Sequence, residues 1–243
     1  MKKQLYIIVG LILAVLAGLS VWYLGIDYEG PTADEIKFKS EYESLNGSTS
    51  TSGKTYQTLS IIKDNKVEYT DLAGAIDMLE SGTGIIYFGF PDCPWCRNLV
   101  SVLIDEIGCS CLEKITYVNI SGLRDTYELQ DGEAVKTQNA SSEYYKILEL
   151  LDSYLNDYTL LNGEESVNVG EKRLYVPLVV GVKKGRVVGV IAEMPELEEG
   201  QNAYDNLTET QKSELKSKIK ELISSVTKEE KNEDEGEVCE ERC

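Results

Sequence analysis

The sequence of 243 residues contains no histidine. This absence excludes Ser-His-Asp and Cys-His nucleophile systems, zinc and iron sites with histidine ligands, and haem attachment through Cys-x-x-Cys-His. Basic residues are also few, because 24 Lys and Arg stand against 42 Asp and Glu, which gives a formal net charge of −18. We expect no binding of nucleic acid, since contacts to phosphates need positive charge. The chemistry must come chiefly from sulfur, carboxylates, Lys or Tyr, and we expect no cofactor.

The longest apolar run covers residues 5–26 and contains no charged residue. A helix of that length spans about 33 Å, enough to cross the hydrocarbon core of a bilayer. Because two lysines precede the run and acids follow it, the N-terminus is predicted to be cytoplasmic and the domain after it extracytoplasmic. A cleaved signal peptide is the competing interpretation, but its apolar region would be shorter and would end at an Ala-x-Ala-like site. We therefore expect a single-pass anchor in the cell membrane, with 1–26 as the anchor region, and cysteines in a setting where disulfides persist.

The chain after the anchor divides into three parts. Residues 27–56 are polar and include a run of Gly, Ser and Thr, which predicts a linker. Residues 57–226 have the patterning of a globular domain and are numerous enough to bury a core. Residues 227–243 are acidic and almost free of apolar side chains, which indicates a solvated tail.

Helix and strand patterns alternate along residues 57–226. Helices are predicted over 71–81 with Thr70 as the N-cap, from Cys93 to Gly108, over 141–155, and after the capping box of residues 208–211. Strands are predicted at 84–90 and 115–120, and a hairpin at 174–182 and 187–193, whereas the charged segment 124–133 is predicted to be a loop. This order predicts an α/β domain with a mixed central sheet flanked by helices.

The chemistry is concentrated in the segment Cys93-Pro94-Trp95-Cys96, where a predicted strand meets a helix. Unpaired backbone N–H groups and the positive end of the helix dipole favour a thiolate at Cys93, the predicted N-cap. Pro94 suits the first helical position, because a proline lacks the N–H that the helix would not use. Cys96, one turn into the helix, is close enough to resolve a mixed disulfide formed at Cys93. Without a histidine, this helix terminus must supply most of any lowering of the Cys93 pKa, with Arg97 as an assisting charge.

These features resemble the thioredoxin superfamily. The residues that carry the resemblance are the strand at 85–90, CPWC at 93–96 with the helix after it, and Val176-Pro177 at the entry to a hairpin. The resemblance covers 57–226 and implies a thioredoxin-like fold with an enlarged insertion at about 121–173. The phrase GFPDCPWCRN is also similar to membrane-anchored extracytoplasmic members and to bacteriocin-transport-accessory-like proteins.

The resemblance implies roles for individual residues. Cys93 would be the nucleophile and Cys96 the resolving cysteine. Pro177 would be a cis-proline beside this pair, and the backbone of Val176 would pair with an incoming substrate strand, so Trp95, Val176 and Pro177 are the expected substrate-binding residues.

One position departs from the family pattern. Thioredoxins place a buried acid six residues before the first cysteine, where it accepts the proton of the second cysteine, and here that position is Tyr87. Asp92 is the nearby carboxylate that would have to take this role. Otherwise the deprotonation of Cys96 would be slow.

A zinc site is the alternative for a Cys-x-x-Cys motif, and Cys109-x-Cys111 offers a possible second half. The helical pattern between the two motifs would separate Cys96 and Cys109 by about 20 Å, too far for ligands of one metal. We therefore predict no metal at Cys93 and Cys96. For Cys109, Cys111, Cys239 and Cys243 three possibilities stay open: structural disulfides, a second redox pair that exchanges electrons with the first, or a zinc site.

The predicted function is that of a membrane-tethered, extracytoplasmic thiol–disulfide oxidoreductase. Its expected partners are cysteine-containing exported polypeptides and a possible redox partner protein, together with the membrane through residues 5–26. Pro-Trp between the cysteines resembles the Pro-x dipeptides of glutaredoxins and bacterial disulfide oxidases, which favours an oxidase or isomerase over a reductase. The alternative is a non-catalytic thioredoxin-like adaptor for a peptide exporter, in which CPWC is a structural disulfide.

Overall fold

The computed structural model describes residues 30–163 and 165–228. The predicted membrane anchor and the tail with Cys239 and Cys243 lie outside these residues. Within the described ranges, no helix combines the length and the apolar character needed to cross a membrane. Residues from Ala33 onward belong to one unit, which holds all the elements described below.

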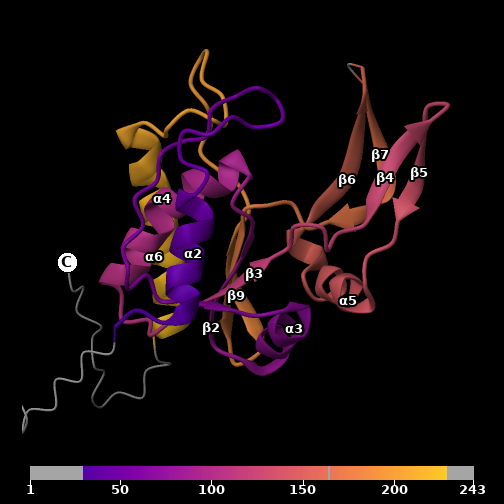
Figure 1. The fold of residues 1–243 in the computed structure, drawn as a ribbon. Helices are drawn as coiled ribbons and strands as arrows, with labels where there is room; N and C mark the ends of the chain where they lie inside the picture. The colour runs from indigo at the N-terminus through magenta and orange to yellow at the C-terminus, as the bar shows by residue number, and fades with distance from the viewer. Residues whose placement is uncertain (1–29, 164, 229–243) are drawn as a thin grey trace, which may run out of the picture. The chain divides into compact units, whose positions relative to one another are not determined.

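A five-stranded mixed sheet forms the centre of this unit (Figure 1). Its strand order is β1-β3-β2-β8-β9, with the bounds β1 Val67–Tyr69, β2 Gly84–Gly89, β3 Ile115–Asn119, β8 Leu178–Lys183 and β9 Arg186–Ile191. The first three strands of that order run parallel to one another, and β8 pairs antiparallel with both β2 and β9. The predicted α/β class with a mixed central sheet is confirmed.

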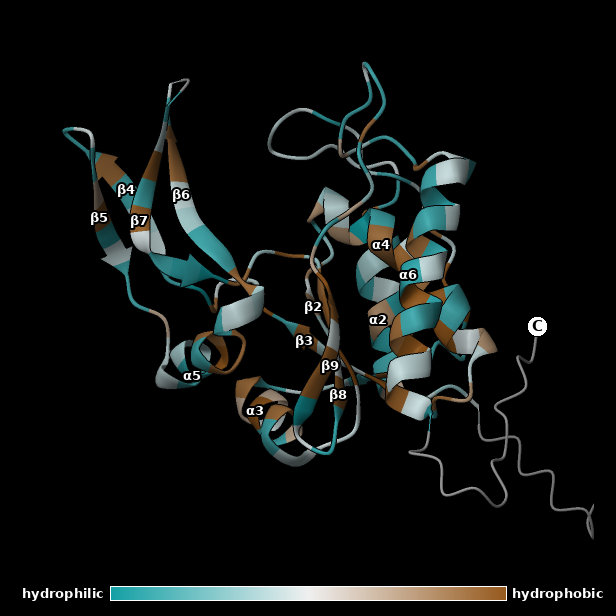
Figure 2. Ribbon diagram, turned by 180° about the vertical axis from the view of Figure 1, so that it is seen from behind, coloured by the Kyte–Doolittle hydropathy of each residue, from teal (hydrophilic) through white to brown (hydrophobic). Residues whose placement is uncertain are grey.

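Helices cover both faces of the sheet, and the central strand β2 explains why. All of its residues are buried, and side chains along a strand alternate between the two faces. Ile85 and Tyr87 pack with α2 (Ala33–Glu43), α4 (Pro94–Cys109) and α6 (Glu209–Thr227). Ile86 and Phe88 pack with α3 (Leu72–Ser81) and α5 (Ser142–Leu150) on the other face. Figure 2 shows the hydrophobic residues of these helices turned toward the sheet.

The helix termini largely follow the sequence prediction. The capping box before α6 is confirmed, because Thr208 and Gln211 each accept a hydrogen bond from the other's backbone N–H. The prediction of Thr70 as N-cap is wrong: Asp71 caps α3, its carboxylate accepting from the N–H of Gly74 at 2.9 Å. A carboxylate at that position also lies favourably at the positive end of the helix dipole.

Helix α2 lies within the range that the sequence suggests as a linker. Its Phe38 and Tyr42 are completely buried and pack against Tyr117 of β3, with the ring centroids of Phe38 and Tyr117 5.0 Å apart. The helix was missed because it buries few apolar side chains among many charged ones, while its Ile36 is 56% exposed. Residues 33–43 thus belong to the core of the domain.

Two hairpins occupy the expected insertion. They pair β4 (Thr126–Gln130) with β5 (Glu133–Gln138) and β6 (Asn156–Asn162) with β7 (Glu165–Arg173), and they extend together away from the central sheet (Figure 1). The prediction of a loop at 124–133 is wrong. Most residues of these strands are exposed or half-buried, and their alternating apolar side chains are few among many charged and polar ones, so the strand signal in the sequence is weak. A short 3-10 helix, Asp152–Tyr154, follows α5.

Candidate active site

Cys93 lies at the junction between β2 and α4, as the sequence predicts. Phe90 and Pro91 end the strand, the N–H of Cys93 donates to the carbonyl of Phe90 at 3.3 Å, and Cys93 becomes the N-cap of α4. The N–H of Cys96 donates to the Cys93 sulfur at 3.3 Å. Pro94 occupies the first turn, where its missing N–H costs no hydrogen bond. The Cys93 sulfur thus takes the place that a serine or aspartate oxygen takes in an ordinary N-cap.

The segment before β8 meets the cysteine pair. The Val176–Pro177 peptide bond is cis, and the thiol of Cys93 lies 3.8 Å from the carbonyl oxygen of Val176, to which it donates. The two segments are more than eighty positions apart in sequence, and the pairing of β2 with β8 brings them together. Cys93, Val176 and Pro177, chosen from the sequence, therefore share one site, and Trp95 lies partly exposed in the first turn of α4 beside them.

The surroundings of Cys93 favour its thiolate. A hydrogen bond from the Cys96 thiol is the largest cause that holds its pKa below the ordinary value, and the backbone N–H groups of Cys96 and Trp95 and the charge of Arg124 act in the same direction. Burial opposes them, since only 7% of Cys93 is exposed. Arg124 comes from the loop before β4, and its guanidinium lies 5.3 Å from the ring centroid of Phe90. Arg124 is not predictable as a site residue from the sequence, because only the fold brings it to Cys93.

Cys96 has the opposite character. It is completely buried, and burial is the largest cause that raises its pKa well above the ordinary value, followed by its interaction with Cys93. A hydrogen bond from the Tyr87 hydroxyl and one from the backbone at Phe90 act against this rise. The two cysteines are free thiols in the structure, one easily ionised and the other not.

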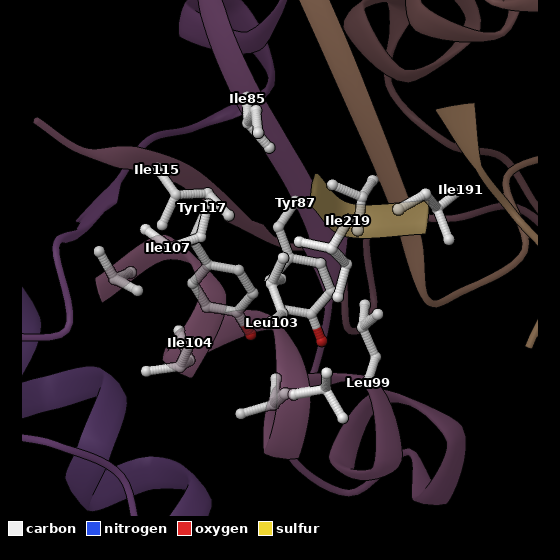
Figure 3. Packing of buried hydrophobic residues seen from close by; sticks show 14 of the residues in the cluster. Ile85, Tyr87, Leu99, Leu103, Ile104, Ile107, Ile115, Tyr117, Ile191 and Ile219 are labelled. Carbon is white, nitrogen blue, oxygen red and sulfur yellow. The ribbon is translucent and has the colours of Figure 1, made fainter. Parts of the chain in front are cut away.

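Tyrosine hydroxyls line the buried side of Cys96. The hydroxyl oxygens of Tyr42 and Tyr87 lie 2.8 Å apart, and the Tyr117 hydroxyl donates to the carbonyl of Gly89 at 3.3 Å. The rings of Tyr87 and Tyr117 are stacked with centroids 5.2 Å apart, and Figure 3 shows their hydroxyls on the same side of the core. Asp92, the carboxylate considered for the buried acid's role, is exposed. The side chain that contacts Cys96 in its place is Tyr87 itself.

Arg97 has a structural role beside the site. It is completely buried, and its guanidinium donates to four neutral oxygens: the carbonyls of Tyr42, Gln57 and Pro91 and the side-chain oxygen of Asn46. It thereby fastens α2 and the segment after it to the first turns of α4. The charge that lowers the pKa of Cys93 comes from Arg124, not from Arg97 as the sequence suggested.

Cys109 and Cys111 lie far from this pair. Cys109 is the last residue of α4, so thirteen helical steps separate it from Cys96 by about 20 Å. Both Cys109 and Cys111 are disulfide-bonded. Cys239 and Cys243, which the sequence grouped with them, lie outside the described residues.

Comparison with known proteins yields no match, neither to a protein-family model nor to a curated protein.

Proposed function

We propose that the protein is a thiol–disulfide oxidoreductase of the thioredoxin superfamily with Cys93 as its nucleophile. The observation that carries the proposal is the position of Cys93, at the N-cap of α4 and 3.8 Å from the carbonyl of the residue before a cis-proline. The strand, the Cys-x-x-Cys helix and the hairpin entered through Pro177 occur in the order that the resemblance implies. The hairpins β4–β5 and β6–β7 are then additions of this chain to a thioredoxin-like core.

The unequal cysteines support distinct roles. Cys93, whose pKa is lowered, is the sulfur that attacks a substrate disulfide or is attacked by a substrate thiolate. Cys96, buried and with a raised pKa, reacts only with Cys93. Access to substrate therefore runs through the partly exposed surface of Trp95 and Val176, with the buried Pro177 behind them.

The oxidising reaction balances as follows. A substrate thiolate attacks Cys93 in the Cys93–Cys96 disulfide, the S–S bond breaks, and Cys96 leaves as a thiolate that takes up a proton. A second substrate thiolate then attacks the substrate sulfur of the mixed disulfide and releases Cys93 as a thiolate. The substrate loses two electrons to the cysteine pair. Of the two protons of the substrate thiols, one ends on Cys96 and the other goes to solvent while Cys93 stays a thiolate, and a redox partner protein reoxidises the pair.

This oxidising direction is favoured by the stabilised thiolate of Cys93. Groups that stabilise the reduced form of such a pair raise its reduction potential and make the disulfide a stronger oxidant. The N-cap hydrogen bonds, the Cys96 thiol and the charge of Arg124 all act on the reduced form. An oxidase or isomerase acting on exported, cysteine-containing polypeptides fits these contacts and the predicted location outside the membrane.

The proposal is tested with the reduced full-length chain in which Cys109, Cys111, Cys239 and Cys243 are replaced by serine, so that Cys93 and Cys96 are its only thiols. The reagent is an aromatic disulfide, 5,5′-dithiobis(2-nitrobenzoate), whose released thiolate absorbs visible light. Attack by Cys93 gives a first release, and attack by Cys96 on the mixed disulfide gives a second. We expect both releases in this chain, neither of them in Cys93→Ser, and only the first in Cys96→Ala. Rapid release that survives Cys93→Ser would overturn the assignment.

The same protein separates the proposal from the non-catalytic adaptor. An adaptor with a structural CPWC disulfide predicts slow exchange and a potential below about −300 mV. An oxidase predicts a potential well above that value and, in cells that carry Cys96→Ala, covalent complexes with exported polypeptides. An empty trap together with a low potential would favour the adaptor.

A further inference from the structure

Two buried hydroxyls beside Cys96 have no part in the exchange scheme above. Tyr42 comes from α2 and Tyr87 from β2, both side chains are at most 1% exposed, and their oxygens lie 2.8 Å apart. Buried polar groups are normally hydrogen-bonded. The hydrogen bond between the two hydroxyls uses only one of their two protons, so the other proton needs a further acceptor. Cys96 is itself completely buried, and hydrogen bonding from the Tyr87 hydroxyl acts against the rise in its pKa, so the two hydroxyls lie on the side of a reacting sulfur.

We propose, building on the exchange activity above, that Tyr87 donates a hydrogen bond to the Cys96 thiolate whenever it forms, and that Tyr42 orients the Tyr87 hydroxyl for this. Tyr87 touches a reacting atom and is a catalytic residue in this sense. Tyr42 acts through Tyr87 and is a positioning residue.

The number of hydroxyl protons decides which tyrosine donates in each of these hydrogen bonds. A tyrosine hydroxyl has one proton to donate. When Tyr87 donates it to Cys96, the Tyr87 oxygen can only accept in the Tyr42–Tyr87 pair, so Tyr42 is the donor there. The Tyr117 hydroxyl is turned to the carbonyl of Gly89 at 3.3 Å and does not compete for the sulfur.

The hydroxyl acts as a donor and not as a base. Burial raises the pKa of Tyr87 well above its ordinary value, so the side chain keeps its proton at every pH at which exchange occurs. A thiolate at Cys96 is costly because burial disfavours its charge, and a hydrogen bond to that charge offsets part of the cost. In the family pattern a buried acid takes the proton. In this chain the charge of Cys96 would be stabilised where it arises.

The resolving step balances without a protein base. In the mixed disulfide, Cys96 loses its proton, its sulfur attacks Cys93, the bond from Cys93 to the substrate sulfur breaks, and the departing thiolate takes up the proton. The reverse step forms the same Cys96 thiolate as the leaving group. The Tyr87 hydrogen bond therefore speeds both directions of the bond-forming and bond-breaking event at Cys96.

The titratable groups that face Cys96 are Cys93, Tyr87 of β2, Tyr42 of α2, Tyr117 of β3 and Arg124 of the loop before β4. Because Cys93 is held in the mixed disulfide at that stage, the pH profile of the second release reports the ionisation of Cys96, whose pKa lies well above its ordinary value.

The test compares Tyr87→Phe and Tyr42→Phe with Tyr69→Phe in the release assay described above. Tyr69 packs against the same ring, Tyr117, but its hydroxyl donates to Glu41 at 2.8 Å, so it is the matched control. At neutral pH we expect Tyr87→Phe to slow the second release about tenfold or more, as for loss of a hydrogen bond to a charged group. Its pH profile should move to higher pH. Tyr42→Phe should act in the same direction but less, and Tyr69→Phe should change neither release.

Each outcome of this comparison supports or overturns the proposal. If the second release keeps its rate and pH profile in both variants, or slows in Tyr69→Phe to the same extent, the proposal is overturned. Should Tyr87→Phe fail to fold by circular dichroism, Tyr42→Phe carries the test alone. Absence of the first release in the wild type would remove the exchange activity and with it this proposal, a failure distinct from an unchanged second release.

Discussion

The guanidinium of Arg97 in α4 donates to the backbone carbonyl of Tyr42 in α2 at 2.7 Å. This bond joins a helix near the start of the domain to the helix that presents the cysteine pair. It also fixes the backbone of the residue whose hydroxyl reaches Tyr87. The position of α2 and the buried surroundings of Cys96 thus depend on the same contact.

Replacing Arg97 by lysine should destabilise the fold although it keeps the charge. An ammonium group cannot satisfy the carbonyls of Tyr42 and Gln57 and the Asn46 side chain with the geometry of a planar fork. We expect the free energy of unfolding, measured by urea denaturation, to fall by about 1–3 kcal/mol. Arg186→Lys, at an exposed position of β9, is the control and should change it by less than about 0.5 kcal/mol. Equal effects would contradict the role of Arg97.

Helix α2 should behave as core rather than linker. Phe38→Ala removes a completely buried ring that packs against Tyr42 and Tyr117, and it should cost about 3–5 kcal/mol of unfolding free energy. Ile36→Ala, on the exposed side of the same helix, should cost less than about 0.5 kcal/mol. Thermal unfolding of the two variants measures the difference. A small effect of Phe38→Ala would mean that α2 does not pack as described.

The pH dependence of Cys93 reactivity should reveal which neighbouring groups lower its pKa most. Alkylation by iodoacetamide follows the thiolate, and because the pKa of Cys93 is lowered, the wild type should reach half its maximal rate at a lower pH than an ordinary cysteine does. Loss of a group that stabilises the thiolate raises the pKa and moves the profile to higher pH. Cys96→Ala should move it furthest, because the Cys96 thiol is the largest cause of the lowering, and Arg124→Gln should move it less.

Arg124→Lys is the matched control for that series, since it keeps the positive charge. We expect its alkylation profile to lie between those of the wild type and Arg124→Gln. A profile of Arg124→Gln that coincides with the wild type would show that the arginine does not act on Cys93.

Gly89→Ala should disturb the site without touching a cysteine. A Cβ at this position would overlap the ring and hydroxyl of Tyr87. We expect a loss of about 1–3 kcal/mol in stability, as for an overpacked core, and a slower second thiol release, because the Tyr87 hydroxyl would be displaced from Cys96. Gly30→Ala, where no atom lies within 4 Å of the new carbon, is the control. Normal release in a destabilised Gly89→Ala would contradict the link between Tyr87 and Cys96.

Several features could be predicted from sequence because they depend on local pattern. The apolar run of β2, the helix that begins after Cys93, and the capping box at Thr208 each need only neighbouring residues to be recognised. The pairing of Cys93 with the Val176–Pro177 segment was also expected, but through resemblance to a family rather than through the pattern itself.

Other features escaped prediction because their stabilising contacts are distant in sequence. Helix α2 has few apolar residues, and its place in the core depends on contacts of Phe38 and Tyr42 with β3 and β2. The strands of the two hairpins bury little on either face, so the short alternation of apolar and polar residues in β4 does not stand out from a charged loop. Arg124 became part of the site only because the chain returns from β3 past Phe90.

The sequence by itself predicted sulfur chemistry, because it has no histidine and carries a Cys-x-x-Cys at a helix start. It assigned most of the lowering of the Cys93 pKa to the helix terminus, whereas in the structure the Cys96 thiol is the largest cause and the backbone N–H groups come after it. It also identified Tyr87 as the position where an acid is missing. Only the tertiary structure decided which side chain meets Tyr87, because its hydroxyl pairs with that of Tyr42, forty-five positions away on a helix that the sequence does not indicate. A buried thiolate is stabilised by whichever donors the fold brings to it, and that choice depends on packing between distant segments.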